Sequence, residues 1–421
     1  MNTPIKSIVG GSIGNLIEWY DWYTYSVFSM YFAGAFFPEE DATAQLLNTA
    51  GIFAIGFLMR PLGGWLLGAY ADRQGRKAAL TLSVLLMCLG SLLIALAPGY
   101  HQIGILAPSL LVVARLIQGL SVGGEYGTVA TYLSEIAPDG RKGLYSSFQY
   151  VSTTLGQLLA LGVLLALQRF FLTAEQLEAW GWRIPFLIGT ALALLALLLR
   201  QNLSETTDFI KNRPNAGRAG TFRELGKYRK ETALVVGLTI GLTVSYYTFT
   251  TYIQKFLVNT AGFSKSDSTV ITLVSLTLFM LVQPLAGWLG DRFGTKRMMI
   301  IYGVLGILTT YPLLMWLQNP GGISQAIGLI TVALVILSLA TSVSAIIKAE
   351  LFPVAVRTLG VSLPYALTVA VFGGSAEYVA LLFKQVGYAN WFYGYITFCL
   401  LLTLYASMQL KPAARLLPDK G

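Results

Sequence analysis

The chain has 421 residues, of which 55% are hydrophobic and 12% are charged, and its formal net charge is +9. An average soluble domain is about 25% charged, so this composition excludes an ordinary soluble protein and indicates a polytopic membrane protein. Nucleic-acid binding is the other class that a positive charge suggests, but the basic residues sort by loop, which favours membrane topology. The single histidine, His101, argues against a histidine-based metal site, and Cys88 and Cys399, each alone in an apolar segment, are expected to be free, buried thiols.

Apolar segments long enough to span a membrane recur along the whole chain, since about 20 such residues cross the hydrocarbon core. The first is expected to be a span and not a cleaved signal, because it is long and contains Glu18 and Asp21. We therefore predict an all-α membrane protein with 12 transmembrane helices. The spans are expected to begin near Ile8, Leu46, Ala78, Gly104, Leu144, Ile184, Ala233, Asp267, Met298, Ser324, Thr358 and Trp391.

The basic residues define the expected sidedness of the spans. Of the 29 Lys and Arg residues, 21 fall on one set of loops and termini, five on the opposite set, and three within spans. The excess marks the cytoplasmic side, so both termini are predicted to be cytoplasmic. Residues 201–232, which include "KNRPNAGRAG", are predicted to form a flexible cytoplasmic linker between two six-helix bundles, residues 1–200 and 233–421.

The two halves of the sequence repeat. "GAYADRQGRK" after the second span matches "GWLGDRFGTKR" after the eighth, which places Asp72 and Asp291 219 residues apart. "SEIAPDGRKG" after the fourth span corresponds to "AELFPVAVRTLG" after the tenth, with Glu135 and Glu350 215 residues apart. Two related six-span halves are typical of transporters that bind substrate between the halves near the bilayer midplane.

The loop G-x-x-x-D-R-x-G-R-K is the hallmark of the major facilitator superfamily, which the chain resembles over nearly its whole length. Further stretches are similar to the metabolite:proton symporter branch of that superfamily, which includes bacterial permeases for 2-oxoglutarate, citrate, shikimate and proline/betaine. They are "NLIEWYDWYTYS", "GFLMRPLGGWLLG", "ARLIQGLSVGGEYGT" and "WGWRIPF". "TFTTYIQKFLVNTAG" and "GGSAEYVALLFK" most resemble the 2-oxoglutarate (α-ketoglutarate) permeases. The resemblance implies the major facilitator fold, with two pseudo-symmetric six-helix halves.

Charged residues of the repeated loops are interpreted as a gate. Asp72 can lie at the N-terminus of a neighbouring helix, and Arg76 and Arg73 can pair with acids such as Glu135. The alternative is that these residues only fix the topology. The full predicted gate comprises Asp72, Arg73, Arg76, Glu135, Arg141, Asp291, Arg292, Glu350 and Arg357.

Two charges within spans reach overlapping depths. At about 1.5 Å per residue, Arg115 lies about 16 Å into its span and Asp21 about 20 Å into the first span. In sugar–proton symporters of the same superfamily, an Asp of span one and an Arg of span four form a proton-coupling pair, and Asp21 and Arg115 match those positions. A substrate carboxylate that draws Arg115 away from Asp21 favours protonation of Asp21. The alternative is a static buried salt bridge. Glu18 is either a second proton site or a partner of Arg60.

The remaining intramembrane polar residues suggest the kind of substrate. Arg60, as a substrate anchor or a structural partner, together with Arg115 and Lys348 suits a small anion with two carboxylates. Lys348 alone is interpreted as an end charge that snorkels to the interface. Glu125 is assigned to packing and gating in preference to binding, and Glu377 to an outer gate. The predicted substrate-binding residues are Arg60, Arg115, Tyr25, Gln157, Tyr246, Tyr247 and Thr250, with Tyr20, Tyr23 and Gln254 near them.

Taken together, these observations and the resemblance imply a proton-coupled symporter that imports a small dicarboxylate, most closely α-ketoglutarate, across a bacterial inner membrane. Citrate, shikimate or proline/betaine as substrate, and export instead of import, stay open as alternatives. The resemblance implies a working monomer. No nucleophile–base, metal or phosphate-binding motif occurs in the sequence, so we expect no enzyme activity, no metal and no cofactor apart from protons as coupling ion. A non-transporting sensor is the alternative of another class.

Overall fold

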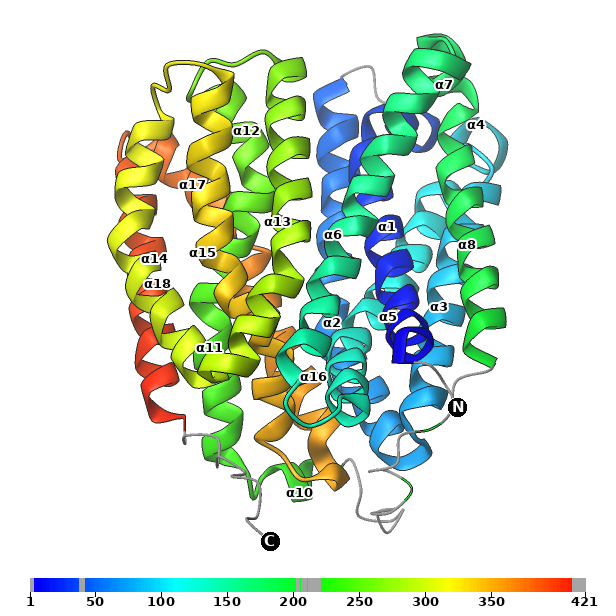
Figure 1. The fold of residues 1–421 in the computed structure, drawn as a ribbon. Coiled ribbons are helices and arrows are strands. Elements are labelled where there is room, and N and C mark those ends of the chain that lie inside the picture. The colour runs from blue at the N-terminus through cyan, green and yellow to red at the C-terminus, as the bar shows by residue number, and fades with distance from the viewer. Residues whose placement is uncertain (1–3, 38–41, 202–204, 206–209, 211–220, 411–421) are drawn as a thin grey trace, which may run out of the picture. The chain divides into compact units, whose positions relative to one another are not determined.

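The computed structural model describes residues 4–37, 42–201, 205, 210 and 221–410. Regular structure within these residues is helical, and the ribbon in Figure 1 is built of helices and connecting loops. The predicted linker sequence "KNRPNAGRAG" lies outside the described residues. The main helices are α1 (Pro4–Phe36), α2 (Ala42–Gln74), α3 (Arg76–Leu96), α5 (Leu106–Ile136), α6 (Lys142–Ala166), α8 (Ile184–Gln201), α11 (Arg229–Tyr247), α12 (Ile253–Asn259), α13 (Lys265–Phe293), α14 (Thr295–Leu317), α15 (Ile323–Glu350), α16 (Arg357–Thr368), α17 (Ala376–Gln385) and α18 (Ala389–Gln409).

Short helices complete the described chain. Three π-helical turns interrupt or extend the long helices: η1 (Leu167–Phe171), η3 (Thr248–Tyr252) and η5 (Val369–Gly373). The other short helices are α4 (Tyr100–Ile103), α7 (Ala174–Ala179), η2 (Gly181–Arg183), α10 (Phe222–Leu225) and η4 (Val354–Val356).

Membrane-spanning segments match the predicted spans. Within the described residues, ten helical segments are long and apolar enough to cross a membrane, and they correspond to the third to twelfth predicted spans. The first two predicted spans are α1 and α2, helices of 33 residues each, which at 1.5 Å per residue are about 50 Å long. Their polar residues include Glu18 and Asp21 in α1 and Arg60 in α2.

Glycine ends the helix in both copies of the repeated loop. Gly75 separates α2 from α3 with φ 107°, and Gly294 separates α13 from α14 with φ 93°. A side chain at either position would be strained in this backbone conformation, which explains why the D-R-x-G pattern turns the chain at the same point in each half. The repeat read from the sequence is therefore also a repeat of backbone geometry.

Glycines also bring α5 close to α2. A Cβ on Gly119 would meet the backbone of Gly56 and the side chain of Met59, and a Cβ on Gly123 would lie 2.7 Å from the Cα of Arg60. Such contacts are too short for any side chain, so the small-residue run in α5 sets the close approach that its four-residue spacing predicts. This approach places Arg60 of α2 next to α5, which carries Arg115.

The chain forms two compact units. Unit 1 comprises Met1–Ile136, Gln149–Arg229 and Phe352–Ala370, and unit 2 comprises Ala137–Phe148, Lys230–Leu351 and Val371–Gly421. Unit 1 thus contains α16, which packs on α2 and α5, and unit 2 contains the start of α6. Cys88 of unit 1 and Cys399 of unit 2 are buried and free, as expected from the sequence.

Candidate functional site

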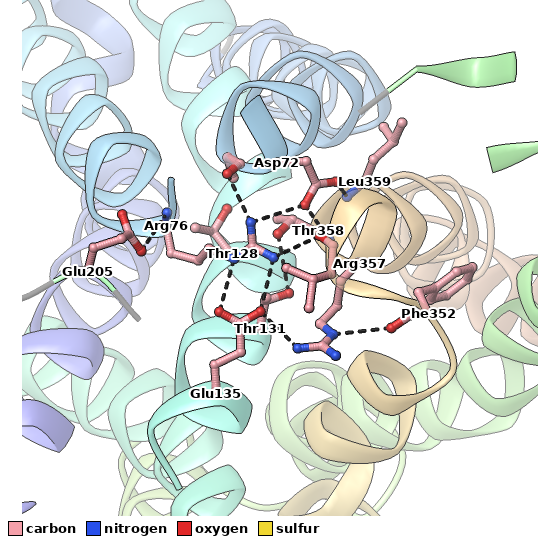
Figure 2. Close-up of polar contacts among 12 residues, drawn as sticks. Asp72, Arg76, Thr128, Thr131, Glu135, Glu205, Phe352, Arg357, Thr358 and Leu359 are labelled. Carbon is pink, nitrogen blue, oxygen red and sulfur yellow. Dashed lines mark hydrogen bonds and ion pairs between the residues drawn. The ribbon is translucent and has the colours of Figure 1, made fainter. Parts of the chain in front are cut away.

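Asp72 caps a helix of unit 1 that comes from far along the chain. Its two carboxylate oxygens accept hydrogen bonds from the backbone N–H groups of Thr358, at 3.1 Å, and Leu359, at 2.9 Å, in the first turn of α16 (Figure 2). The first N–H groups of a helix have no partner within the helix, and the helix dipole favours a negative charge there. The side chain of Asp72 is fully buried. The expected contact between Asp72 and a helix N-terminus is confirmed.

Glu135 joins two arginines in the same unit. The Arg76 guanidinium donates to both carboxylate oxygens of Glu135, at 3.0 and 3.1 Å, and Arg357 Nη1 donates to Oε1 at 2.9 Å (Figure 2). Arg76 also lies 3.4 Å from Asp72 and donates to the carbonyl of Val354. Buried charge-assisted hydrogen bonds contribute about 1.5–3 kcal/mol each, so this cluster binds the segment around α16 firmly to α2, α3 and α5.

Unit 2 contains a second copy of the capping arrangement. Asp291 accepts hydrogen bonds from the backbone N–H groups of Gly143, at 2.6 Å, and Leu144, at 2.9 Å, at the start of α6. The copy is more open than the first, because Asp291 is only partly buried. Glu350, the repeat counterpart of Glu135, pairs with Lys142 at 2.7 Å, and both side chains are more than a third exposed. Solvent weakens such a pair to about 0–1 kcal/mol.

Three predicted gate residues lie at the surface. Arg73 follows Asp72 at the end of α2 and is exposed. Arg141, which the repeat aligns with Arg357, is exposed just before α6, and it is its neighbour Lys142 that pairs with Glu350. The exposed Arg292 lies 5.7 Å from the ring of Trp288 and 5.9 Å from that of Phe293. The acid–helix contact therefore occurs in each unit, whereas the basic residues around it differ between the units.

Within unit 1, two buried guanidinium groups share one aromatic ring. The Arg60 guanidinium carbon lies 4.5 Å from the centre of the Trp22 ring, and that of Arg115 lies 4.2 Å from the same ring. All three side chains are at most 3% exposed. Each arginine also lies over a further ring, Arg60 over Phe57 at 4.5 Å and Arg115 over Tyr25 at 4.4 Å. Cation–π attraction, about 2 kcal/mol or more for a desolvated pair, helps to hold both cations in place.

Polar contacts fix the orientation of the residues around Arg115. Its Nη1 donates to Gln118 Oε1 at 2.7 Å, and Gln118 Nε2 donates to Ser91 Oγ of α3 at 3.0 Å. The Tyr25 hydroxyl donates to the backbone carbonyl of Thr49 at 3.1 Å, so its ring faces Arg115 while its hydroxyl is bonded to α2. Gln118 and Ser91 are fully buried, and neither was singled out from the sequence.

Asp21 is buried on the far side of this network. Its carboxylate lies against Gly189 of α8, where a Cβ would stand 2.9 Å from Asp21 Cγ and 3.2 Å from Oδ2, and the Ser91 hydroxyl faces it from α3. Arg115 is near enough to interact electrostatically with Asp21, but the ion pairs found among the described residues do not include one between them. The two predicted partners are therefore close enough for an electrostatic interaction but form no direct ion pair in the described part of the structure.

Glu18 lies one turn from Asp21 and has a separate environment. Its Oε1 accepts hydrogen bonds from the hydroxyls of Ser83, at 2.6 Å, and Ser121. Glu18, Glu125 and Arg60 contribute to one pocket of unit 1, and the stacked rings of Tyr126 and Tyr365 close part of it with centroids 3.5 Å apart. The pocket is lined by Asn15, Glu18, Trp19, Arg60, Val122, Gly123, Glu125, Tyr126, Tyr365, Ala366 and Val369.

The predicted neutral residues of α11 and η3 lie in unit 2. Tyr246 and Tyr247 are buried with their rings perpendicular and 5.6 Å apart, and Gly373 leaves the space that the Tyr247 ring occupies. Thr250 donates its hydroxyl proton to the carbonyl of Tyr246 at 2.6 Å, which leaves the hydroxyl oxygen as a hydrogen-bond acceptor. Gln254 is bonded to Thr269 of α13 at 3.1 Å.

One interpretation, that of Lys348, is contradicted, and the other predicted residues have varied surroundings. The interpretation of Lys348 as a snorkelling end charge is wrong, because its side chain is only 1% exposed. Tyr20 donates to the carbonyl of Pro185 at the start of α8, and Tyr23 packs on the ring of Trp19. Gln157 is partly buried on α6. Glu377 is in α17, but its side chain is outside the part of the structure that is described.

Metal ligands do not gather at any point of the described structure: no group of three or more His, Cys, Asp or Glu side chains there is arranged to hold a metal ion. The buried contacts described above are made instead by guanidinium groups, carboxylates, hydroxyls and aromatic rings. These are groups that bind and release anions and protons, and they lie on helices of membrane-spanning length.

Apolar helices in two sequence-repeated halves, with buried charges inside the spans, define a multi-pass membrane transporter. The model of the sugar (and other) transporter family matches residues 8–221 and 210–412. The chain therefore belongs to this family of the major facilitator superfamily.

Comparisons with known proteins agree with that membership. The α-ketoglutarate permease of Escherichia coli (strain K12) is 51% identical over 406 residues, which cover 96% of this chain and 93% of the relative. A citrate-proton symporter of Salmonella typhi is 36% identical, covering 89% and 87% of the two chains. The proton:xylose symporter XylE superposes with a TM-score of 0.79 at 19% identity, covering 97% of this chain and 96% of the other. This last likeness confirms the predicted major facilitator fold.

Proposed function

We propose that this protein is a proton-coupled symporter that imports a small dicarboxylate, α-ketoglutarate in the first place, by alternating access. The observation that carries the proposal is the pair of buried guanidinium groups, Arg60 and Arg115, on a chain that is 51% identical to an α-ketoglutarate permease. Arginine presents a planar fork of N–H donors that suits a carboxylate, so two such groups suit two carboxylates.

The 2-oxo group of the substrate requires neutral partners. The neutral residues proposed to contact substrate are Tyr25 and Gln157 in unit 1, and Tyr246, Tyr247 and Thr250 in unit 2. Because backbone carbonyls accept the hydroxyl protons of both Thr250 and Tyr25, we assign the donor role to Tyr246 and Tyr247. Citrate is the second candidate substrate, which the 36% identical citrate-proton symporter favours.

Proton coupling is assigned to Asp21, with Arg115 as its electrostatic partner and Glu18 as a second carboxylate. The carboxylate of Asp21 is buried and held against α8, within the electrostatic range of Arg115. A substrate carboxylate bound to Arg115 compensates the positive charge that Asp21 otherwise experiences, so substrate binding and protonation of Asp21 favour each other. Protons are the coupling ion in this proposal, with no other cofactor and no enzymatic reaction.

The acid–helix contacts are proposed to act as the gate of the transport cycle. Asp72, Glu135 and Asp291 hold the starts of α16 and α6 in one state, and these contacts break in the other state. The gate residues lie on the same set of loops and termini as most of the Lys and Arg residues. We therefore assign the gate and both termini to the cytoplasmic face of a bacterial inner membrane. The proposed working unit is the monomer.

Uptake into proteoliposomes tests the proposal. Vesicles that contain the purified protein are expected to concentrate labelled 2-oxoglutarate when the outside is acidic, and to only equilibrate it without a proton gradient. Asp21→Asn is expected to abolish accumulation while counterflow exchange persists, because the neutral amide cannot carry the proton. Full accumulation by Asp21→Asn would show that the proton site is elsewhere. Competition by citrate, shikimate, betaine and proline identifies the substrate, and a preference for any of these over 2-oxoglutarate contradicts the assignment.

A further inference from the structure

Trp22 stands at the centre of the buried cationic site. Its ring is 2% exposed and makes an edge contact with Phe57, with centroids 4.9 Å apart. Arg60 approaches this ring from α2 and Arg115 approaches it from α5. Both guanidinium groups thus lie over the same ring.

The backbone around the ring leaves it little freedom. A Cβ on Gly56 of α2 would stand 3.1 Å from Trp22 Cη2 and 3.2 Å from Arg115 Nη2, so the glycine provides the space in which ring and guanidinium meet. Gly123 brings the backbone of Arg60 against α5. Trp22 therefore lies among closely packed neighbours that include both arginines.

The spacing suits a short diacid. With guanidinium carbons 4.5 and 4.2 Å from one ring centre, the separation of those carbons is at most about 9 Å. The carboxyl carbons of an extended five-carbon diacid are four carbon–carbon bonds apart, or about 5 Å. Each carboxylate can then form charge-assisted hydrogen bonds with its own arginine, whereas a monoacid satisfies only one of them.

We infer that Trp22 is a specificity-determining residue, which spaces Arg60 and Arg115 so that the site selects diacids by chain length. This inference rests on the proposed function, because it assumes that the two arginines bind substrate. Trp22 acts through the arginines and is also in contact with them, so its removal changes which acids bind and not only how tightly they bind.

Competition by a series of unbranched acids tests the inference. Uptake of labelled 2-oxoglutarate is measured in proteoliposomes against malonate, succinate, glutarate, adipate and the monoacid butyrate. For the wild-type protein we expect the four- and five-carbon diacids to compete best, and butyrate to compete on the order of 10- to 100-fold less well. In Trp22→Phe the best competitors are expected to be shorter diacids, because the smaller ring lets the two guanidinium groups approach each other. In Trp22→Leu the acids are expected to compete about equally well.

A matched substitution separates this effect from a loss of structure. Trp182→Phe changes a fully buried tryptophan that packs on Phe36 and Phe186, away from the two arginines, and is expected to keep the wild-type order of competitors. Thermal stabilisation of each purified variant by the same acids gives a second readout, which does not require transport.

Each outcome decides the question. If both Trp22 variants keep the wild-type order of acids in uptake and in thermal stabilisation, Trp22 does not determine specificity. If no diacid competes with uptake or stabilises the wild-type protein, the proposed function itself fails and the inference fails with it. A changed order in the Trp22 variants, with an unchanged order in Trp182→Phe, supports both.

Discussion

Gly189 offers a way to displace Asp21 without altering any charge. A methyl group at this position, as in Gly189→Ala, would stand 2.9 Å from Asp21 Cγ and 3.2 Å from Oδ2, whereas ordinary contacts begin at 3.4 Å. The carboxylate must therefore move by about half an ångström or more, or α1 and α8 must separate. Overpacking of this kind costs about 1–3 kcal/mol of stability, and a misplacement of about 1 Å at a reacting group can cost about 100-fold in rate.

We expect Gly189→Ala to reduce proton-driven accumulation of 2-oxoglutarate by about 10-fold or more, while counterflow exchange continues. The assay is uptake into proteoliposomes with and without an inward proton gradient, normalised to the amount of reconstituted protein. Gly162→Ala is the matched control, because a Cβ at Gly162 of α6 would have no neighbour within 4 Å. Accumulation by Gly189→Ala equal to that of Gly162→Ala would refute the reasoning, since a displaced Asp21 would then still couple transport to protons.

The remaining predictions concern the gate and the network around Arg115. Glu135→Gln removes the charge that two arginines share, so it should weaken the contacts that hold α16. In a protein whose two native cysteines are replaced, a cysteine at Ser362, which is fully buried in α16, should react faster with a thiol reagent when Glu135→Gln is added. An unchanged rate would exclude Glu135 from the gate. Asp72→Asn should lower the thermal stability of the purified protein by roughly 3 kcal/mol and Asp291→Asn by about 1 kcal/mol, because only Asp72 is fully buried and paired with an arginine. The reverse order would contradict this comparison. Gln118→Leu removes the hydrogen bonds of Gln118 to Arg115 and Ser91, so it should reduce proton-driven accumulation of 2-oxoglutarate more than counterflow exchange of 2-oxoglutarate. Equal losses of accumulation and exchange would assign Gln118 to substrate binding alone.

Part of the gate could be predicted from the sequence because its residues follow a repeated, regularly spaced pattern. D-R-x-G occurs twice at nearly one offset, and the physics of helix termini indicates what an aspartate at that position does. The contact of Asp72 with a helix N-terminus and the pairing of Arg76 with Glu135 were predicted correctly on this basis, whereas the contact of Arg357 with Glu135 was not predicted. Asp291 repeats the first contact, whereas the pairing of Lys142 with Glu350 was missed because the repeat aligns the neighbouring Arg141.

The site around Asp21 and Arg115 could be predicted only in part from the sequence. Counting residues along a span gives the depth of Asp21 and Arg115, but it does not give the direction in which each side chain points around its helix axis. Trp22 and Gln118 carry no charge, so nothing in the sequence distinguished them from other aromatic and polar residues of the spans. Gly189 has no side chain at all, and its role depends wholly on which residue lies opposite. Such features follow from helix packing, which a single sequence does not specify.

Unit 1 combines segments that are far apart in the sequence, and this has a consequence for how the protein is made. Glu135 and Arg357, which are hydrogen-bonded to each other, are separated by 222 residues. At about 5–20 residues per second, the ribosome adds Arg357 on the order of 10 to 45 s after Glu135. During that interval the nascent N-terminal half holds Asp72, Arg76 and Glu135 without the helix that they bind, so its native contacts are completed only when nearly the whole chain has been inserted. Biogenesis of the first half therefore depends on synthesis of the second.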